Sequence, residues 1–202
     1  EDISYYMREA LEPAALSVAS PTESEIYNKL FAPYIYGVTW SPDKSCVAFV
    51  RGDPLSLNGQ MYLWKVGERN AQLIDGVYNR ICAFIWSPDS STVIADSGTY
   101  VTRCGNVVSV KDYKPTFEFG YVGEICWSPD FNEIAVGAMS DVKPDDSLDF
   151  TTDLAVYNIK TGEKKILDKA SSSTYLTAKK WNTDGIIEYT RNTIKGSGGI
   201  LK

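Results

Sequence analysis

The chain has 202 residues, of which 44% are hydrophobic, so it can bury a core of its own and is not a disordered segment. Its formal net charge is −6 and its Lys and Arg residues are scattered, which excludes the clustered basic surface that nucleic acids require. No apolar stretch approaches the roughly 18 residues that cross a membrane, and no basic and apolar leader opens the chain.

Residues 1–33 differ in pattern from the rest of the chain. Between Ile3 and Leu11 the apolar residues follow a helical spacing, and Pro13 limits how far such a helix can extend. We expect a short, partly helical N-terminal extension that docks on the remaining residues or on a partner.

From residue 34 onward, one tetrapeptide returns. Trp-Ser-Pro-Asp occupies 40–43, 86–89 and 127–130, and Trp-Asn-Thr-Asp occupies 181–184. The copies begin 46, 41 and 54 residues apart, which is close to the period of propeller blades. The residues that define the repeat are Trp40, Asp43, Trp86, Asp89, Trp127, Asp130, Trp181 and Asp184.

Each copy has the pattern of a hairpin. Alternating residues precede the Trp, Ser-Pro-Asp suits a type I turn, and a short apolar run follows as the second strand. We expect the recurring Trp to pack between neighbouring blades, where a Trp buries about 150–250 Å². A role as a stacking platform for bases or sugars is the less favoured interpretation.

These patterns predict an all-β fold, a β-propeller of four-stranded antiparallel blades, over residues 34–202. About three and a half blades fit, at about 35–75, 80–119, 121–168 and an incomplete 174–202. In the second blade the third strand is ambiguous, because 99–104 and 106–111 both fit. A closed ring has ~4–8 blades, so we expect a second subunit or further sequence to complete it.

The repeat resembles that of TolB-like propellers, which are related in architecture to WD-repeat propellers. The family unit reads Trp-Ser-Pro-Asp-Gly-Lys, then a short strand, an Ile-Tyr-Val-like strand and a Thr-Gly-Glu turn. The matching parts here are Cys46–Phe49, Met61–Trp64, Leu154–Tyr157 and Thr161–Glu163.

The chain departs from the family pattern at the residue after the repeat Asp. The family prefers Gly there, whereas this chain has Lys44, Ser90 and Phe131 and keeps only Gly185. We therefore expect those turns to be of a different type.

The resemblance implies three functional settings, and it carries over no catalytic residue. Such propellers serve as extracytoplasmic protein-binding modules, as gating domains in prolyl oligopeptidase-type hydrolases, or as polysaccharide-binding domains. Our leading hypothesis is a non-catalytic scaffold, located outside the cytoplasm, that binds a protein partner or a second subunit through a loop face. The alternatives are the propeller of a larger hydrolase and a carbohydrate-binding propeller.

Catalytic chemistry is limited by what the chain lacks. Without any His, the Ser-His-Asp and Cys-His mechanisms and His-ligated metal sites are excluded, and no Gly-x-Ser-x-Gly elbow is present. Catalysis by a pair of carboxylates stays open. We expect no catalytic, cofactor-binding or metal-binding residues and no enzyme activity.

The cysteines show no Cys-x-x-Cys spacing, which disfavours a sulfur-ligated metal site. Cys46, Cys82 and Cys126 lie in or beside apolar runs, so buried thiols are the favoured interpretation. With Cys104 as the fourth, two disulfides in an oxidising compartment are the alternative.

The loops that join the second and third strands of the blades emerge on one face of a propeller, and loops on rigid scaffolds commonly bind. The first blade has such a loop at 52–58, and the third has an aspartate-rich insertion at 140–152. Calcium binding by these aspartates is less favoured than a solvated acidic loop, since the spacing does not match a calcium loop. The candidate partner-binding residues are Arg51, Asp53, Leu55, Leu57, Asp141, Asp145, Asp146, Asp149, Phe150 and Arg191.

Overall fold

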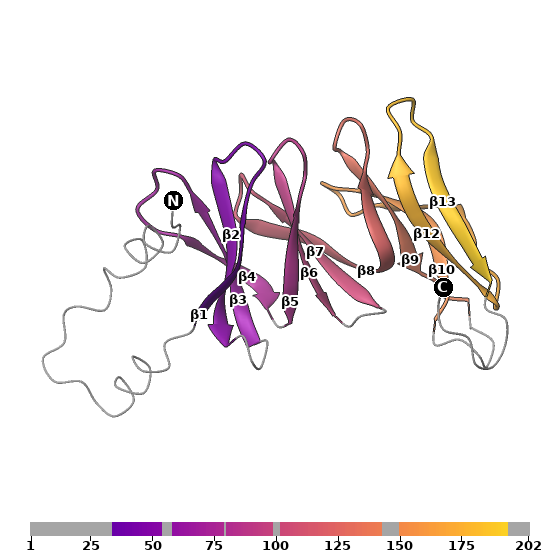
Figure 1. The fold of residues 1–202 in the computed structure, drawn as a ribbon, viewed down its shortest axis with the longest axis horizontal. Helices are drawn as coiled ribbons and strands as arrows, with labels where there is room; N and C mark the ends of the chain where they lie inside the picture. The colour runs from indigo at the N-terminus through magenta and orange to yellow at the C-terminus, as the bar shows by residue number, and fades with distance from the viewer. Residues whose placement is uncertain (1–33, 54–57, 79, 99–101, 143–149, 194–202) are drawn as a thin grey trace, which may run out of the picture. The chain divides into compact units, whose positions relative to one another are not determined.

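The computed structural model describes residues 34–53, 58–78, 80–98, 102–142 and 150–193 (Figure 1). The helix expected in residues 1–33 lies outside these ranges. Every regular element in the described ranges is a β-strand. The described residues therefore include no helix that could cross a membrane. The all-β class and the antiparallel pairing predicted from the sequence are confirmed.

The chain divides into two compact units. The first unit comprises Glu1–Ser97 and Val108–Pro115, and the second comprises Gly98–Val107 and Thr116–Lys202. Strands β7 (Arg103–Ser109) and β8 (Lys114–Trp127) contribute residues to both units. The division into an N-terminal extension and successive blades stays a prediction.

The first unit contains a four-stranded antiparallel sheet in the order β1–β2–β3–β4. These strands span Tyr34–Trp40, Cys46–Asp53, Asn58–Lys65 and Gln72–Tyr78, and together they cover the range of about 35–75 that was expected for the first blade. β2 and β3 pair along their whole length without a register shift. A second antiparallel pair joins β5 (Ile81–Trp86) to β6 (Thr92–Gly98).

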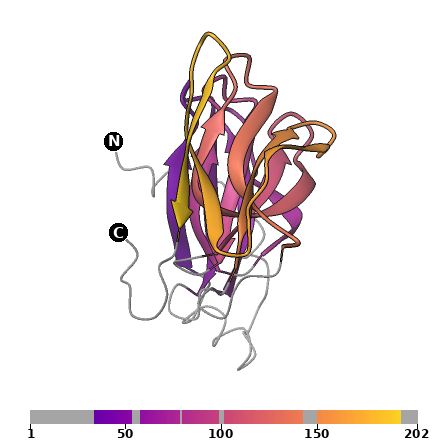
Figure 2. The same cartoon turned by 90° about the vertical axis from the view of Figure 1, so that its right-hand side faces the viewer.

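In the second unit, β8 pairs with β9 (Glu133–Met139), β9 with β10 (Thr152–Asn158), and β10 with β11 (Lys164–Asp168), all antiparallel. A hairpin of β12 (Thr174–Trp181) and β13 (Ile187–Thr193) follows, drawn in yellow in Figures 1 and 2. The ladder between β9 and β10 has no register shift, so these two strands form a regular base for the insertion between them.

Strand β8 is longer than the sequence analysis predicts. It runs for 14 residues through position 120, where we expected one blade to end and the next to begin. Phe117, Phe119 and Tyr121 form a row of rings along it, with successive centroids 5.8 and 5.4 Å apart. Alternate residues of a strand share one face, so this row continues past Gly120 and leaves no place for a turn.

A buried apolar cluster in the first unit lies between the four-stranded sheet and the β5–β6 pair. It includes Val50, Met61 and Leu63 from the sheet and Phe84 and Val93 from the pair. Trp86 packs against this cluster. In the second unit, Trp181 packs in the same way against a cluster that contains residues of β9, β10 and β12. Both Trp side chains therefore lie between neighbouring strand assemblies.

Candidate interaction surface

The four repeated tetrapeptides form the same kind of turn. In each, the N–H of the residue after Asp donates a hydrogen bond to the C=O of the residue after Trp, as in a type I turn. The donor and acceptor residues are Lys44 and Ser41 (3.0 Å), Ser90 and Ser87 (2.9 Å), Phe131 and Ser128 (2.9 Å), and Gly185 and Asn182 (3.0 Å).

The residue after the repeat Asp has a left-handed backbone in every copy. The φ angle is 63° at Lys44, 64° at Ser90, 60° at Phe131 and 86° at Gly185. The expectation that the non-glycine copies form a different turn is therefore wrong. A residue with a side chain is disfavoured in this conformation by roughly 1–2 kcal/mol, so other contacts must hold it there.

Ser41 and Asp43 show how the turn is held. Ser41 Oγ accepts a hydrogen bond from the Cys46 N–H (2.9 Å) and donates one to Asp43 Oδ1 (2.7 Å). The same carboxylate oxygen accepts the Ser45 N–H (3.0 Å). Corresponding bonds link Ser128 to Asp130 (2.7 Å) and the Asn132 N–H to Asp130 (3.2 Å). These bonds fix both sides of the left-handed residue, so the turn does not require glycine.

The same bonds keep the turn carboxylates charged. Hydrogen bonds from Ser41 and Ser45 hold the pKa of Asp43 far below its usual range. Bonds from Asn132 and Ser128 lower the pKa of Asp130 to about 2. At Asp89, burial acts to raise the pKa, but hydrogen bonds from Ser87 and Ser91 outweigh it and the pKa is lowered. These turns therefore present fixed negative charges at neutral pH.

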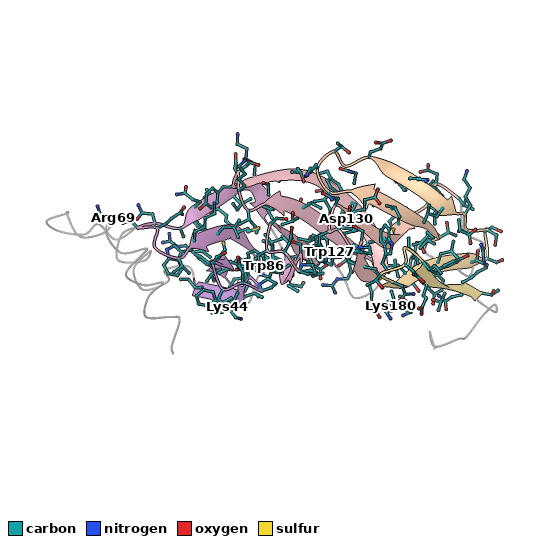
Figure 3. The ribbon with its side chains drawn as sticks, turned by 90° about the horizontal axis from the view of Figure 1, so that it is seen from above. Lys44, Arg69, Trp86, Trp127, Asp130 and Lys180 are labelled. Carbon is teal, nitrogen blue, oxygen red and sulfur yellow. The ribbon has the colours of Figure 1, made fainter. Side chains whose placement is uncertain are left out.

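Two contacts of the first unit connect turns of different strand pairs. The Asp43 N–H, beside the Lys44 labelled in Figure 3, donates to Ser90 Oγ over 3.1 Å. The Tyr113 hydroxyl donates to Glu68 Oε1 over 2.7 Å. Lys65 Nζ lies 4.1 Å from the centroid of the Tyr113 ring, a cation–π distance.

The insertion between β9 and β10 has a closed base, which means that hydrogen bonds join the residues at its two ends. The Ser140 N–H donates to Thr151 O over 3.0 Å, and Thr151 Oγ1 donates to Val142 O over 2.7 Å. Phe150 is only 9% exposed, and its ring meets that of Tyr175 edge-on at 6.1 Å. Phe150 therefore anchors the insertion and does not offer the exposed contact surface that the sequence analysis expected.

Arg191, on β13, lies in an exposed polar cluster. Its Nη2 is 2.7 Å from Asp168 Oδ2, which also accepts the Tyr189 hydroxyl over 2.7 Å. Its Nη1 donates to Lys169 O over 3.3 Å. The bonds from Tyr189 and Arg191 lower the pKa of Asp168, and the bond to Asp168 raises the pKa of Tyr189. A partner that binds Arg191 would have to compete with these groups.

The remaining candidate residues are spread over both units. Arg51 on β2 is half-buried, Asp53 ends β2, and Asp141 is exposed two residues after β9. Arg51 belongs to the first unit, whereas Asp141 and Arg191 belong to the second, so the loop face they were expected to share stays a prediction. The candidates outside the described residues are Leu55, Leu57, Asp145, Asp146 and Asp149.

The four cysteines differ in how far they are exposed. Cys46 and Cys126 are buried, and burial raises the pKa of each to about 11. Cys82 is exposed, contrary to expectation, and it lies where the register of β5 shifts between Ile81 and Ala83. Among the residues that the structure describes, no group of three His, Cys, Asp or Glu could hold a metal ion.

Sequence reasoning missed the residues that connect neighbouring strand pairs, Ser90, Glu68 and Tyr113. Ser90 did carry a signal, since it stands where the family repeat prefers Gly. Nothing local marks Tyr113 and Glu68, which are 45 residues apart in the sequence.

No family model matches the sequence, and no curated protein matches it significantly. Solved structures do share the fold. A prolyl endopeptidase matches with a TM-score of 0.52 and 11% identity, over 76% of this chain and 25% of that chain. The tricorn protease matches with a TM-score of 0.52 and 14% identity, over 75% of this chain and 14% of that chain.

TolB from Acinetobacter baumannii matches with a TM-score of 0.41 and 15% identity, over 76% of this chain and 36% of that chain. The chain thus spans about a quarter of the matched prolyl endopeptidase and less of the tricorn protease. The β-propeller resemblance expected from the repeats is confirmed at the level of the fold.

Proposed function

We propose that this chain is a non-catalytic β-propeller domain that binds a protein partner through the insertion between β9 and β10. The observation that carries the proposal is the closed base of the insertion. Hydrogen bonds at Thr151 and the packing of Phe150 on Tyr175 fix it to a regular strand ladder. Loops projected from such rigid scaffolds are the usual carriers of binding. The absence of His supports a role without catalysis.

The charge of the insertion indicates the chemistry of the partner. Between residues 141 and 149 the sequence has four aspartates, Asp141, Asp145, Asp146 and Asp149, against the single cation Lys143. We therefore propose a partner that presents a basic surface. Such complementarity accelerates association and weakens with added salt, because exposed charges are screened beyond about 10 Å at 0.1 M.

Site-specific photo-crosslinking tests this function. A photoreactive residue in place of Asp141 should give a defined adduct with one partner, and the adduct should be lost when Asp145, Asp146 and Asp149 are changed to Lys. The matched control is the same residue in place of Asp112, which is exposed on a turn of the first unit. Equal adducts from both positions, or adducts unaffected by the charge reversals, would contradict the proposal.

A second function is favoured by the fold comparison, namely the propeller of a larger prolyl oligopeptidase-type hydrolase. The prolyl endopeptidase that shares the fold is about four times as long as the stretch that this chain matches in it. The gene sequence on either side of this chain tests the alternative. A hydrolase domain in the same reading frame would support it, and an unrelated neighbouring sequence would exclude it.

A further inference from the structure

We infer that Ser90 and Tyr113 form a two-point clamp that fixes turns of the four-stranded β1–β4 sheet within the first unit. Ser90 binds the turn between β1 and β2, and Tyr113 binds the turn between β3 and β4. We further infer that both residues keep a strained left-handed backbone because it aims their side chains at these turns. The clamp is a conformational device that does not depend on the proposed partner.

The first point of the clamp is the hydrogen bond from the Asp43 N–H to Ser90 Oγ (3.1 Å). Ser90 is 6% exposed and has a φ of 64°. Lys44 occupies the equivalent position in the preceding turn with nearly the same φ, but its side chain is exposed and makes no hydrogen bond within the described residues. The turn itself therefore does not require Ser, and the contact with Asp43 gives this side chain a role.

The second point is the hydrogen bond from the Tyr113 hydroxyl to Glu68 Oε1 (2.7 Å). Tyr113 has a φ of 55°, and its N–H donates to Ser109 O within its own turn (3.0 Å). Lys65 Nζ covers the ring from the same β3–β4 hairpin. Burial and the neighbouring Glu68 raise the pKa of Tyr113, so its hydroxyl remains a donor at neutral pH.

Both residues of the clamp have a left-handed backbone conformation. A strained conformation persists when the surrounding contacts over-determine it. Glycine at either position would relieve the strain, but it would also remove the side chain that reaches the sheet. Strain at Ser90 and Tyr113 is therefore coupled to a contact, whereas strain at the exposed Lys44 is not. This difference supplies a matched control.

Amide hydrogen exchange in the full chain tests the first point. In Ser90→Ala the Asp43 amide should exchange about five- to tenfold faster, because it loses its acceptor, while the Ser41 amide, bonded to Cys46 O, keeps its rate. Lys44→Gly should leave the Asp43 amide unchanged and raise the melting temperature by a few degrees (~2–4 °C). In Ser90→Gly the melting temperature should rise less than in Lys44→Gly, or should fall. Unchanged Asp43 exchange in Ser90→Ala, or equal rises in both glycine variants, would overturn the first point.

A double-mutant cycle tests the second point. Tyr113→Phe and Glu68→Ala should each lower the melting temperature, and the double variant should lose clearly less than their sum, because either change alone breaks the same bond. Additive losses would overturn it. Since Tyr113→Phe keeps the ring and the packing, this arm remains informative if the Ser90 variants fold poorly.

Discussion

Thr152 satisfies both backbone polar groups of Leu176 with one hydroxyl. Its Oγ1 donates to Leu176 O over 2.6 Å and accepts the Leu176 N–H over 2.9 Å, and Thr152 is fully buried. These groups of Leu176 lie on the edge of β12 that faces away from β13. The Thr152 side chain on β10 therefore replaces the backbone hydrogen bonds that a neighbouring strand would make to Leu176. In this way it holds the β12–β13 hairpin on the rest of the second unit.

Thr152→Val should lower the free energy of unfolding by about 2–4 kcal/mol, because it leaves a buried N–H and a buried C=O unpaired at nearly constant volume. Urea denaturation followed by circular dichroism measures the change. Thr152→Ser, which keeps the hydroxyl, is the control and should retain most of the stability. A Val variant as stable as the Ser variant would show that the two bonds contribute little.

Gly137→Ala should lower the free energy of unfolding by more than the loss of a single contact would. A Cβ at this position would lie 2.1 Å from Leu176 O, a backbone atom that cannot move aside without displacing β12. We expect a loss of about 3 kcal/mol or more, at or above the upper end for overpacking.

The control for Gly137 is Gly185→Ala in the same unit. No atom lies within 4 Å of a Cβ at Gly185, so this variant meets only the backbone strain of its φ of 86°, roughly 1–2 kcal/mol. Thermal melting of both variants makes the comparison. Equal losses would mean that the close approach of β12 to Gly137 is not what constrains this position.

Trp86→Ala should cost about 3–5 kcal/mol, as large truncations in apolar cores do. Trp86 packs against the main cluster of the first unit, and its buried Nε1 has no hydrogen-bond partner among the described residues. Trp86→Phe keeps an aromatic ring and removes this unpaired donor, so it should cost much less. Chemical denaturation of both variants checks the difference, and similar losses would show that the indole has a specific role beyond packing.

The stability of the turns should depend on pH through Asp130. Its pKa in the folded protein, about 2, is lower than the value near 4 expected for an unfolded Asp. A lowered pKa means that the carboxylate stabilises the fold fully above pH 4 and that this contribution is lost as the pH falls from about 4 towards 2. Asp130→Asn should therefore melt below the parent protein at pH 7, and the difference should shrink towards pH 2. A difference that stays constant over this range would contradict the assignment.

The sequence predicts the repeated hairpins well because their signals are local. Trp40, the Ser-Pro-Asp turn and the apolar run at Val47–Val50 lie within a few residues of one another, and the structure follows them closely. The left-handed residue was missed at Lys44 because propensity alone predicts Gly there. The bonds from Ser41 and Ser45 to Asp43 outweigh that preference.

The candidate site was less predictable, since its decisive contacts join residues far apart in the sequence. The sequence predicts that Phe150 is an exposed loop residue, but in the structure its ring packs against the ring of Tyr175. Arg191 likewise has no evident partner in the sequence, but in the structure it forms an ion pair with Asp168. Burial and pairing of this kind depend on tertiary packing, which the period of a repeat does not specify.

The aromatic row along β8 bears on how the protein can be cut into fragments. A fragment ending at residue 120, the blade boundary suggested by the repeats, would separate Phe119 from Tyr121 and uncover two rings that are 3% and 2% exposed. Such fragments would be prone to aggregate. Expression limits and circular permutations should therefore leave β8, Lys114–Trp127, uncut.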